Sequence, residues 1–435
     1  MATTFKRVSV VFGALLICTF LLVNLPDKIS AISSAILGKS VTQVVPWGAF
    51  ILSILFGYFL VTVLFPFLLT VGWVLFAGKK RQTAKAAPFI SIIIPAFNEE
   101  RSILRSLEAL NKIEYPSFEV IVINDGSTDF TFSVIESSFV KCIHLRTNQG
   151  KAAALNAGIA AAIGQIIVFS DSDSWLHPMS LRYLAQGFSD SSIGAVSGTV
   201  EIDPQDNILR RWQVLEYTFG QFFVKEAQLG SGASVAICPG PVCAFRKELL
   251  IQIGGFSSRT ITEDFDATLE IIKSGYSVNY APKAIAYTEA PSTFQQLKRQ
   301  RLRWFPGHLQ TFCHHQPLFF SSRAGSLGIY WLPFYYLIFG YLCGALELVI
   351  IPFLLLLFFT SSNLPAILLT TCLYNFFALV FVFTGYGFVL VYTNRFSWSL
   401  LGSALLSYPY LLYLNWLRLC AIINELRGKS ATWSG

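Results

Sequence analysis

The sequence predicts an α/β domain with a mostly parallel sheet, inserted between transmembrane α-helices. Charged residues make up only 13% of the 435 residues, whereas soluble proteins carry roughly 25%. These charges are concentrated between Lys79 and Arg323. Within that polar stretch, short apolar runs alternate with helical patterns, which is typical of a sheet covered by helices on both faces.

Long apolar runs on both sides of the polar stretch predict about two transmembrane helices before it and about three after it. Basic residues favour the cytosolic side of a membrane, so Lys79, Lys80 and Arg81 predict a cytosolic domain in an integral protein of the cell membrane. The last run leaves two alternatives open: either it does not fully cross, or Arg427 and Lys429 lie outside. The predicted spans are residues 8–25, 45–76, 329–360, 364–392 and 398–423.

The chain is thereby divided into four predicted regions. The net charge is +7, and many basic residues stand beside apolar segments, as in the cluster Lys298, Arg299, Arg301 and Arg303. This arrangement indicates contact with a membrane surface and differs from the basic stripe or tail of a nucleic-acid-binding protein. The regions are an N-terminal transmembrane region (1–80), a cytosolic domain (81–290), interfacial amphipathic helices (291–323) and a C-terminal transmembrane region (324–435).

The eight cysteines show no Cys-x-x-Cys spacing, and the five histidines show no His-x-x-x-His pair. The cysteines are therefore interpreted as free thiols that pack like small apolar residues. The adjacent His314 and His315 are interpreted as a surface pair, with a metal site as the alternative.

Three buried strands are expected in the first half of the cytosolic domain, and each is followed at once by polar residues. Open α/β sheets bind ligands just beyond the carboxyl ends of their strands. A ligand site is therefore predicted at that edge of the sheet. The expected strands are residues 89–95, 118–124 and 165–170, and a helix is expected at 151–163.

Asp171 and Asp173 follow the third strand in "IIVFSDSD". Side chains two residues apart on a strand point to the same side, so these two carboxylates converge on one point. A hard divalent cation such as Mg²⁺ takes a few carboxylate oxygens together with substrate phosphates, and it would relieve their repulsion. The alternative is a loop with solvated or helix-capping aspartates.

Two further acidic segments are candidates for the site. Asp125 ends the second strand, where its carboxylate can accept hydrogen bonds from a nucleobase or ribose, or form an ordinary Asp-Gly turn. The segment "ITEDFDATLEI" holds Glu263, Asp264 and Asp266. Repulsion between adjacent acids raises a pKa, which suits a general base. A helix start capped by Thr262, with acids stabilised by the helix dipole, is an alternative that is compatible with this role.

Gln300, Arg303 and Trp304 form a Gln-x-x-Arg-Trp pattern on a predicted helix. Spacings of three and four residues make Gln300 a neighbour of both others on the helix surface. An Arg side chain can bind a diphosphate through two hydrogen bonds, and an indole ring can stack on a sugar. The alternative is a basic amphipathic helix on the membrane surface, to which Lys298 and Arg299 are suited.

These four segments, in this order, resemble the family 2 inverting glycosyltransferases, most closely the processive synthases of hyaluronan, chitin, cellulose and poly-N-acetylglucosamine. The resemblance covers residues 87–310 and implies a GT-A-type nucleotide-sugar-binding domain, a UDP-sugar donor and Mg²⁺ or Mn²⁺ as cofactor. Besides the Gln-x-x-Arg-Trp motif, it is carried by "SIIIPAFNEE", "NQGKAAALNAG", "CPGPVCAFRKELL" and "GGFSSRTITEDFDATLEIIKSGY".

The resemblance also implies roles for individual residues. Asp264, beside Glu263, would be the base that deprotonates the acceptor hydroxyl. Gln300, Arg303 and Trp304 would hold the leaving diphosphate and the acceptor sugar. Asp173 and Asp171 would bind the metal, and the donor-binding residues would be Pro95, Asn98, Glu99, Asp125, Lys151, Asp171 and Asp173.

The expected function is therefore that of an enzyme, a UDP-sugar-dependent hexosyltransferase. We expect it to polymerise a β-linked polysaccharide, with UDP-N-acetylglucosamine as the donor, and to translocate the product. The alternative is transfer of one sugar to a membrane lipid such as a ceramide or polyprenyl phosphate. A transporter or sugar-binding scaffold would not need Asp171, Asp173 and Asp264 together. Expected partners are the donor, the growing polymer or lipid acceptor and the lipid bilayer, with an accessory membrane subunit left open and no nucleic acid.

Overall fold

The computed structural model of the chain describes residues 87–203, 207–345 and 395–428, together with 348–349, 386–387, 390–391 and 393. The chain forms two compact units: Met1–Val71 with Phe334–Trp416, and Gly72–Pro333 with Leu417–Gly435. The predicted spans at 8–25 and 45–76 lie outside the described residues, as do parts of those at 329–360 and 364–392.

The predicted span at 398–423 forms two helices, α15 (Trp398–Leu405) and α16 (Tyr408–Leu426). A further helical segment, η6, covers Leu327–Cys343. Among the described residues, no helix is both long and apolar enough to cross a bilayer. Insertion of the domain between transmembrane helices therefore stays a prediction.

The second unit is built on one eight-stranded sheet with the strand order β3-β2-β1-β4-β7-β6-β8-β5. Four of its seven neighbouring pairs are parallel, namely β1–β2, β1–β4, β2–β3 and β6–β8, so the predicted mostly parallel sheet is confirmed. The strands are β1 (Ile90–Ala96), β2 (Phe118–Asp125), β3 (Lys141–Leu145), β4 (Ile166–Phe169), β5 (Ser174–Leu176), β6 (Ile193–Ile202), β7 (Cys243–Arg246) and β8 (Ser277–Thr288).

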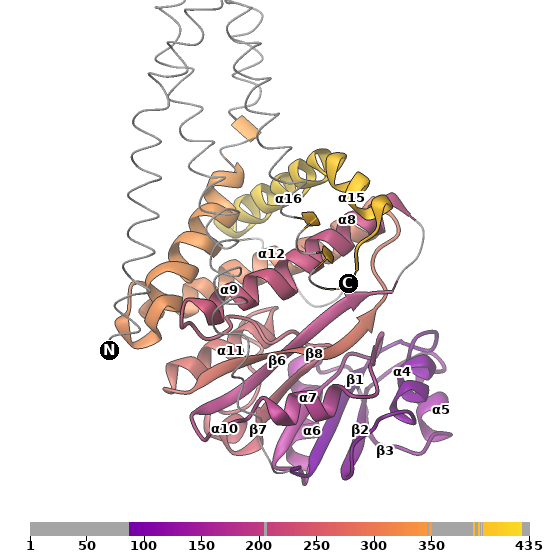
Figure 1. Cartoon of the computed structure of the whole chain (residues 1–435). Coiled ribbons are helices and arrows are strands. Elements are labelled where there is room, and N and C mark those ends of the chain that lie inside the picture. The colour runs from indigo at the N-terminus through magenta and orange to yellow at the C-terminus, as the bar shows by residue number, and fades with distance from the viewer. Residues whose placement is uncertain are drawn as a thin grey trace, which may run out of the picture. The chain divides into compact units, whose positions relative to one another are not determined.

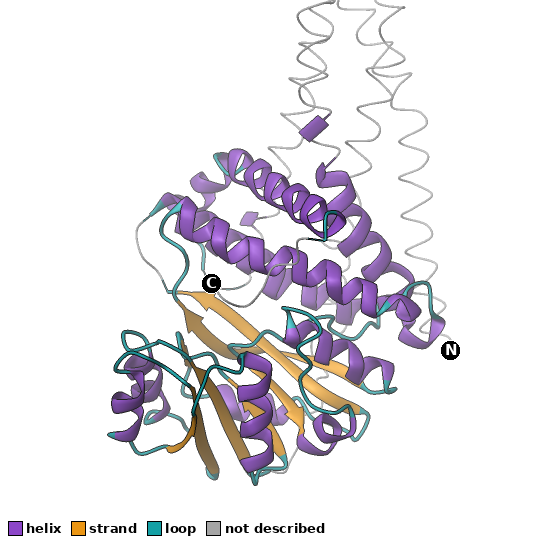
Figure 2. Cartoon of the chain, turned by 180° about the vertical axis from the view of Figure 1, so that it is seen from behind, coloured by secondary structure: helices purple, strands orange, loops and turns teal. Residues whose placement is uncertain are grey.

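Helices pack against both faces of this sheet, as the opposite views of Figure 1 and Figure 2 show. Helix α6 (Lys151–Ala161) lies so close to β1 that a Cβ on Gly158 would come within 2.5 Å of Ile93 Cγ2. Burial on both faces explains the continuous apolar runs of the central strands. The other helices are α4 (Ile103–Leu110), α5 (Thr131–Glu136), α7 (Ser180–Gln186), α8 (Ile208–Tyr217), η3 (Thr218–Val224), α9 (Lys225–Gly230), α10 (Lys247–Gln252), α11 (Glu263–Lys273) and α12 (Phe294–His314).

The pairing of strand β6 is irregular at Gly198. Its pairing with β8 shifts register between Ser197 and Thr199, and a Cβ on Gly198 would lie 2.6 Å from Val242 Cγ2. The buried Lys225 donates a hydrogen bond of 2.8 Å to Gly198 O. A β-bulge of this kind bends a strand and increases its twist.

Helix α12 begins with a capping box, in which Thr293 accepts a hydrogen bond from the backbone of Gln296 while the Gln296 side chain reaches back. It lies side by side with α8 in both cartoon views (Figure 1, Figure 2). The two helices are joined by an ion pair of 2.9 Å between Arg301 and Glu216. The described part of the fold therefore brings α12 against the same domain that holds the strand-end acids.

Candidate active site

Asp125 joins the end of β2 to the start of α6. Its carboxylate is 2% exposed and accepts hydrogen bonds from the backbone N–H groups of Gln149 (2.8 Å) and Gly150 (2.9 Å). Gly126 follows with φ of 70°, and a Cβ there would lie 2.6 Å from Asn148 N, so a glycine is required in this turn. Asp125 therefore shapes the loop before α6, and its contact with a nucleoside stays a prediction.

Asn98, just after β1, is bound to the loop that follows β2. It adopts φ of 56°, a left-handed conformation that Asn tolerates better than most residues. Its side-chain oxygen accepts a hydrogen bond from Thr128 N (2.9 Å), and its own N–H donates to Ser127 Oγ (3.0 Å). Pro95 lies three residues earlier, in β1, where it is paired with Ile123 of β2. The two loops at this edge thus form one connected surface.

Glu99 extends that surface toward the aspartates after β4. Burial raises the pKa of Glu99, a hydrogen bond from the Ser102 hydroxyl acts in the opposite direction, and the charges of Asp173 and Asp171 raise it further. Its backbone N–H donates to Thr131 Oγ1 at 2.7 Å. The electrostatic coupling means that Glu99, Asp171 and Asp173 share one region of negative potential.

Lys151, the first residue of α6, bridges two groups of acids. Its Nζ lies 2.8 Å from Asp171 Oδ1 and 3.1 Å from Glu263 Oε1. Burial alone would lower the pKa of Lys151, but the charges of Asp171, Glu263 and Asp264 outweigh it and raise the pKa well above its usual range. The ammonium group therefore stays charged and draws the acids after β4 together with those at the start of α11.

Gly240 lies against this ion pair. A Cβ on Gly240 would come within 3.0 Å of both Asp171 Oδ2 and Lys151 Nζ. Its backbone N–H donates a hydrogen bond of 3.2 Å to Asp264 Oδ2. The absence of a side chain thus lets the loop between Cys238 and Cys243 contact both groups of acids at once.

Asp264 occupies the first turn of α11. Burial raises its pKa to about 6, the charge of Glu263 adds to this, and Lys151 acts in the opposite direction. The backbone N–H of Phe265 also donates to Asp264 Oδ1 at 2.8 Å. The adjacent acid thus contributes to the raised pKa, as expected, but burial of Asp264 is the larger cause. A carboxylate that is ionised at neutral pH, but has a pKa near it, suits general base catalysis.

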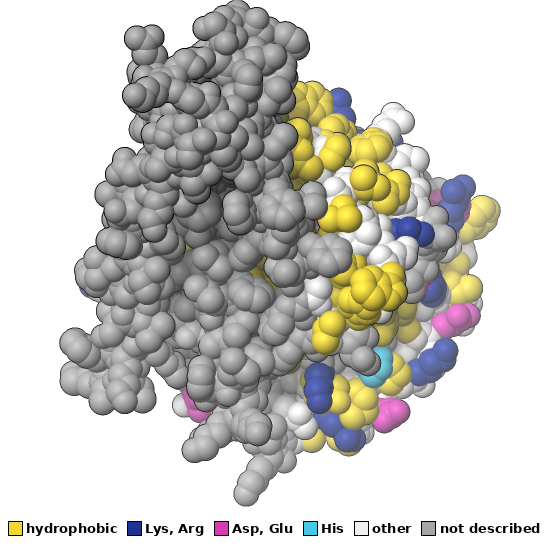
Figure 3. All heavy atoms as spheres, turned by 45° about the horizontal axis from the view of Figure 1, so that its top comes forward, with side chains coloured by type: hydrophobic (Ala, Val, Ile, Leu, Met, Phe, Trp, Pro, Cys, Tyr) yellow, Lys and Arg dark blue, Asp and Glu magenta, His cyan; other side chains and the backbone are white. Residues whose placement is uncertain are grey.

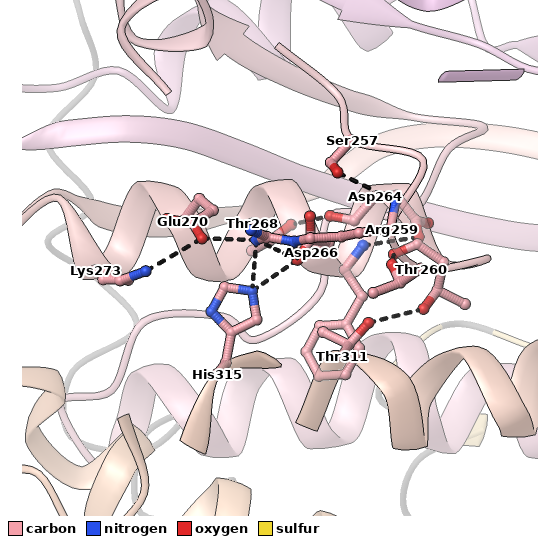
Figure 4. Close-up of polar contacts among 12 residues, drawn as sticks. Ser257, Arg259, Thr260, Asp264, Asp266, Thr268, Glu270, Lys273, Thr311 and His315 are labelled. Carbon is pink, nitrogen blue, oxygen red and sulfur yellow. Dashed lines mark hydrogen bonds and ion pairs between the residues drawn. The ribbon is translucent and has the colours of Figure 1, made fainter. Parts of the chain in front are cut away.

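The rest of the α11 start differs in part from expectation. Three acids do lie in its first turn, as the helix dipole favours. Thr262 occupies the predicted N-cap position of α11, but its hydroxyl makes no capping hydrogen bond and lies 3.1 Å from Thr311 Oγ1 instead. The interpretation of His315 as a surface residue is wrong: it is fully buried, with Nε2 2.8 Å from Asp266 Oδ1 (Figure 4).

Asp173 lies beyond Asp171 and keeps contact with solvent. Its pKa is raised by the protein that crowds around it and limits its hydration, and by the charge of Asp171. Ser174 Oγ donates to Asp173 Oδ1 at 3.1 Å. Among the described residues, no group of three or more His, Cys, Asp or Glu side chains is arranged to hold a metal ion alone. Two carboxylates together with a bound diphosphate are the kind of oxygen ligands that Mg²⁺ takes.

The predicted Gln-x-x-Arg-Trp residues all lie on α12. Arg303 is exposed, and Gln300 Oε1 is buried without a hydrogen-bond donor from the described part of the chain. Arg301 is 1% exposed, pairs with Glu216 and lies 4.3 Å from the centre of the Trp304 ring. The interpretation of Arg301 as part of a membrane-facing basic cluster is therefore wrong, because its side chain turns inward to a carboxylate.

Sequence reasoning did not identify Tyr217 as a residue near the site, although the centre of its ring lies 6.0 Å from the Arg301 guanidinium of α12. Burial raises the pKa of Tyr217 to about 12, Arg301 acts to lower it, and Glu216 and Asp173 act to raise it. The phenol therefore lies within electrostatic reach of both groups. The segment "VLEYTFG" carries no local signal for this role, because Glu216 and Arg301 are 85 positions apart. Gly240, between two prolines, could have been noticed as a site of close backbone approach.

Comparison with known proteins identifies the family of this domain. Residues 87–307 match the sequence profile of the family described as "Glycosyltransferase like family 2". The probable glycosyltransferase YdaM of Bacillus subtilis is 30% identical over 257 residues, which cover 56% of this chain and 61% of that protein. The poly-beta-1,6-N-acetyl-D-glucosamine synthase of Staphylococcus epidermidis is 31% identical over 223 residues, which cover 50% of this chain and 54% of that protein.

A solved structure shares the fold. It is the mannosyltransferase PcManGT of Pyrobaculum calidifontis in complex with GDP-Man and Mn²⁺, with a TM-score of 0.53 and 18% identity over 87% of this chain and 99% of that one. The match confirms a GT-A-like α/β arrangement. The sequence matches span less than two thirds of the curated relatives, so they bear on the domain and not on the whole proteins.

Proposed function

Because this chain belongs to the glycosyltransferase-like family 2, we propose that it transfers a sugar from a nucleotide-sugar donor to an acceptor hydroxyl, with inversion at the anomeric carbon. One observation carries the proposal. Asp264, with a pKa of about 6, lies in one cluster with Glu263, Lys151 and Asp171. A base for the acceptor and acids for the donor diphosphate are thereby brought to one edge of the sheet.

The reaction is a single displacement. The acceptor hydroxyl gives its proton to Asp264, and its oxygen forms a bond to the anomeric carbon of the donor. The bond between that carbon and the diphosphate oxygen breaks, and the nucleoside diphosphate leaves with the electron pair. An α-linked donor then gives a β-linked product. The Gly240 N–H, 3.2 Å from Asp264 Oδ2, holds the base in place for this step.

Asp171 and Asp173 would hold Mg²⁺ or Mn²⁺ together with the donor diphosphate. Their carboxylates are hard oxygen ligands, and their mutual repulsion favours a cation between them. When bound, the ion supplies positive charge that stabilises the departing diphosphate. Lys151 orients Asp171 through their ion pair.

Helix α12 would contribute the acceptor and leaving-group contacts. Gln300 Oε1 is a buried acceptor that a sugar hydroxyl can satisfy, since no described residue donates to it. Trp304 offers a ring for stacking on the acceptor sugar, and Arg303 offers an exposed guanidinium for the diphosphate. The Arg301 guanidinium packs on the Trp304 ring, 4.3 Å from its centre.

UDP-N-acetylglucosamine is the proposed donor and a β-linked polysaccharide the proposed product. The relatives named poly-beta-1,6-N-acetyl-D-glucosamine synthases support both. The support extends over about half of each chain. Translocation of the polymer is proposed from the long apolar runs of the sequence.

Association with a membrane is proposed for the same reason, and a second observation supports it. Hydrophobic side chains gather on the face turned to the viewer in Figure 3. Exposed apolar residues of this kind suit a lipid surface, and a membrane lipid acceptor is therefore the second candidate substrate. In and near α15 and α16 the exposed ones are Phe396, Trp398, Leu405, Leu406, Tyr408, Leu411, Trp416, Ile423 and Leu426.

The test is to incubate the purified full chain with UDP-sugars and Mg²⁺ or Mn²⁺, and to measure UDP release and product size. We expect release from UDP-N-acetylglucosamine and a long β-linked product. A product that carries one sugar on a lipid would favour the second candidate, a membrane lipid acceptor, over polymer synthesis. Absence of transfer from every UDP-sugar, with chitin-type, cellulose-type and lipid primers supplied, would contradict the proposed function.

The matched variants are Asp264→Asn and Asp190→Asn. Loss of the base should lower kcat by roughly 10²–10⁴-fold while UDP binding is retained. Asp190 lies in a surface loop, where it binds Ser192, and its variant should keep wild-type turnover. Wild-type turnover by Asp264→Asn would remove that residue from its proposed role.

A further inference from the structure

We propose that His315 is a positioning residue for this reaction: through Asp266 it fixes the first turn of α11, which carries Asp264. The proposal rests on the proposed function, because it takes Asp264 as the base. It adds a residue that lies outside the acidic cluster and outside the Gln-x-x-Arg-Trp segment. Figure 4 shows its surroundings, with α11 above and the end of α12 below.

His315 follows the last residue of α12 and is fully buried. Its Nε2 lies 2.8 Å from Asp266 Oδ1, and its backbone N–H donates to Thr311 O at 3.0 Å. Its Nδ1 is buried, and no described residue offers it a hydrogen bond. Nε2 is therefore the ring nitrogen that is placed to donate to Asp266, whereas Nδ1 makes no hydrogen bond with the described part of the chain.

Asp266 is the centre of the contact. Burial alone would raise its pKa, but hydrogen bonds from His315 and Arg259 outweigh burial and lower it. Arg259 Nη2 lies 2.7 Å from Asp266 Oδ1 and 2.6 Å from Glu270 Oε1. The carboxylate thus stays ionised and joins three segments: the loop before α11, α11 itself and the residue after α12.

The segment before Asp264 is packed on the same half of α12. A Cβ on Gly307 would lie 2.7 Å from Thr262 Cγ2, so the two backbones approach closely. Thr262 Oγ1 lies 3.1 Å from Thr311 Oγ1, and Ile261 N donates to Gln310 Oε1 at 3.3 Å. The backbone on both sides of the proposed base is therefore attached to one helix.

Residues two apart on an α-helix are rotated by about 200° around its axis, so their side chains point to nearly opposite sides. Asp264 accordingly faces Gly240 while Asp266 faces His315. The turn is held from both sides, and the second attachment comes from the helix that carries Gln300, Arg303 and Trp304. His315 thus sets the position of the base relative to the residues proposed to hold the acceptor. A displacement of about 1 Å at a reacting group costs on the order of 10²-fold in rate.

The predicted kinetic signature follows from this geometry. The donor-binding candidates lie at the ends of β1, β2 and β4 and at the start of α6, whereas the described contacts of His315 are to Asp266, Arg259 and Thr311. Loss of the Asp266 contact should therefore lower kcat and leave the KM for the UDP-sugar nearly unchanged. A residue that merely stabilised the domain would change neither once the protein is folded.

The experiment compares His315→Leu, His315→Gln and Thr199→Val. Leu keeps the volume and removes the donor, whereas the Gln amide can donate to Asp266 much as Nε2–H does. We expect His315→Leu to lose on the order of 10–100-fold in kcat, with less than about threefold change in donor KM and with Gln restoring most of kcat. Thr199 is a buried residue whose hydroxyl lies 2.7 Å from Tyr280 OH, so its variant controls for loss of a buried hydrogen bond.

Hydrogen exchange of the peptide that covers residues 261–268 gives a readout independent of turnover. It should be faster in His315→Leu and in Asp266→Asn, and unchanged in His315→Gln and Thr199→Val. Wild-type kcat and wild-type exchange in a folded His315→Leu would overturn the proposal, as would equal impairment of the Gln and Leu variants. Should His315→Leu fail to fold, Asp266→Asn decides by the same two measurements. If the wild type transferred no sugar while hydrogen exchange in the variants changed as expected, only the proposed function would be contradicted.

Discussion

The ammonium nitrogen of Lys151 lies 3.1 Å from Glu263 Oε1, so the first residue of α6 contacts the first residue of α11. The same nitrogen lies 2.8 Å from Asp171 Oδ1. One cation therefore connects the proposed donor side of the site to the proposed base. Replacement of Lys151 should therefore affect both the donor side and the base, and the charges of these groups determine the direction of each change.

Replacing Lys151 by Met should move the acidic limb of the pH–rate profile to higher pH. Asp264 acts as a base only when ionised, so activity rises with pH through its pKa of about 6. Lys151 lowers that pKa, and its loss should shift the limb by about one unit to higher pH. The measurement is kcat/KM between pH 5 and 8. Lys141→Met, which removes an exposed contact to Ala161 O, is the control and should leave the limb in place.

Replacing Glu263 by Gln should move the acidic limb of the pH–rate profile to lower pH. The charge of Glu263 raises the pKa of Asp264, so its removal lets Asp264 ionise at lower pH. This variant also distinguishes the roles of Glu263 and Asp264. If Glu263 were the general base, Glu263→Gln would be inactive at every pH. A profile that moves upward, or does not move, would contradict the electrostatic account.

Gly240→Ala should reduce turnover with little loss of stability. The added Cβ would press on Asp171 Oδ2 and Lys151 Nζ, each at 3.0 Å, and both are ends of side chains that can shift. We expect kcat to fall by roughly 10–100-fold. Gly220→Ala is the matched control, since nothing lies within 4 Å of a Cβ there. Thermal unfolding and turnover of both variants check the result, and a fully active Gly240→Ala would refute the close contact.

Asp173→Asn should weaken the response to divalent cations. If Asp173 is a ligand, the Mg²⁺ or Mn²⁺ concentration for half-maximal activity should rise by at least about tenfold. Chelation should stop the wild type, and added metal should restore it. Titration of activity with metal decides the matter, with Asp190→Asn as the carboxylate control. An unchanged metal requirement would assign the cation to other groups.

The first half of the fold was readable because its strands are buried on both faces. Ile90, Ile92, Ile93 and Ile94 have no exposed area, so the run "FISIIIP" stands out among polar neighbours. Strand β3 was missed, because its sequence KCIHL is short and polar and lies at the sheet edge. The antiparallel pairs of β7 were also missed, since pairing partners are set by tertiary contacts.

The acids of the candidate site could be found for a similar reason: they directly follow buried strands or start a helix. Arg301 and His315 could not be found, because a charged residue and a histidine pair normally indicate surface. Their partners, Glu216 and Asp266, are 85 and 49 positions away. Such contacts are made by the packing of α12 on α8 and α11, and no local pattern encodes them.

The turn that carries Asp171 and Asp173 connects β4, in the middle of the sheet, to β5, at its edge. Strand β5 pairs with the last residues of β8, beyond the register shift next to Gly198. The two ends of the turn are therefore anchored to strands that lie far apart in the sheet order. The proposed cation site thus depends on the assembly of the whole sheet and cannot form from the local segment alone.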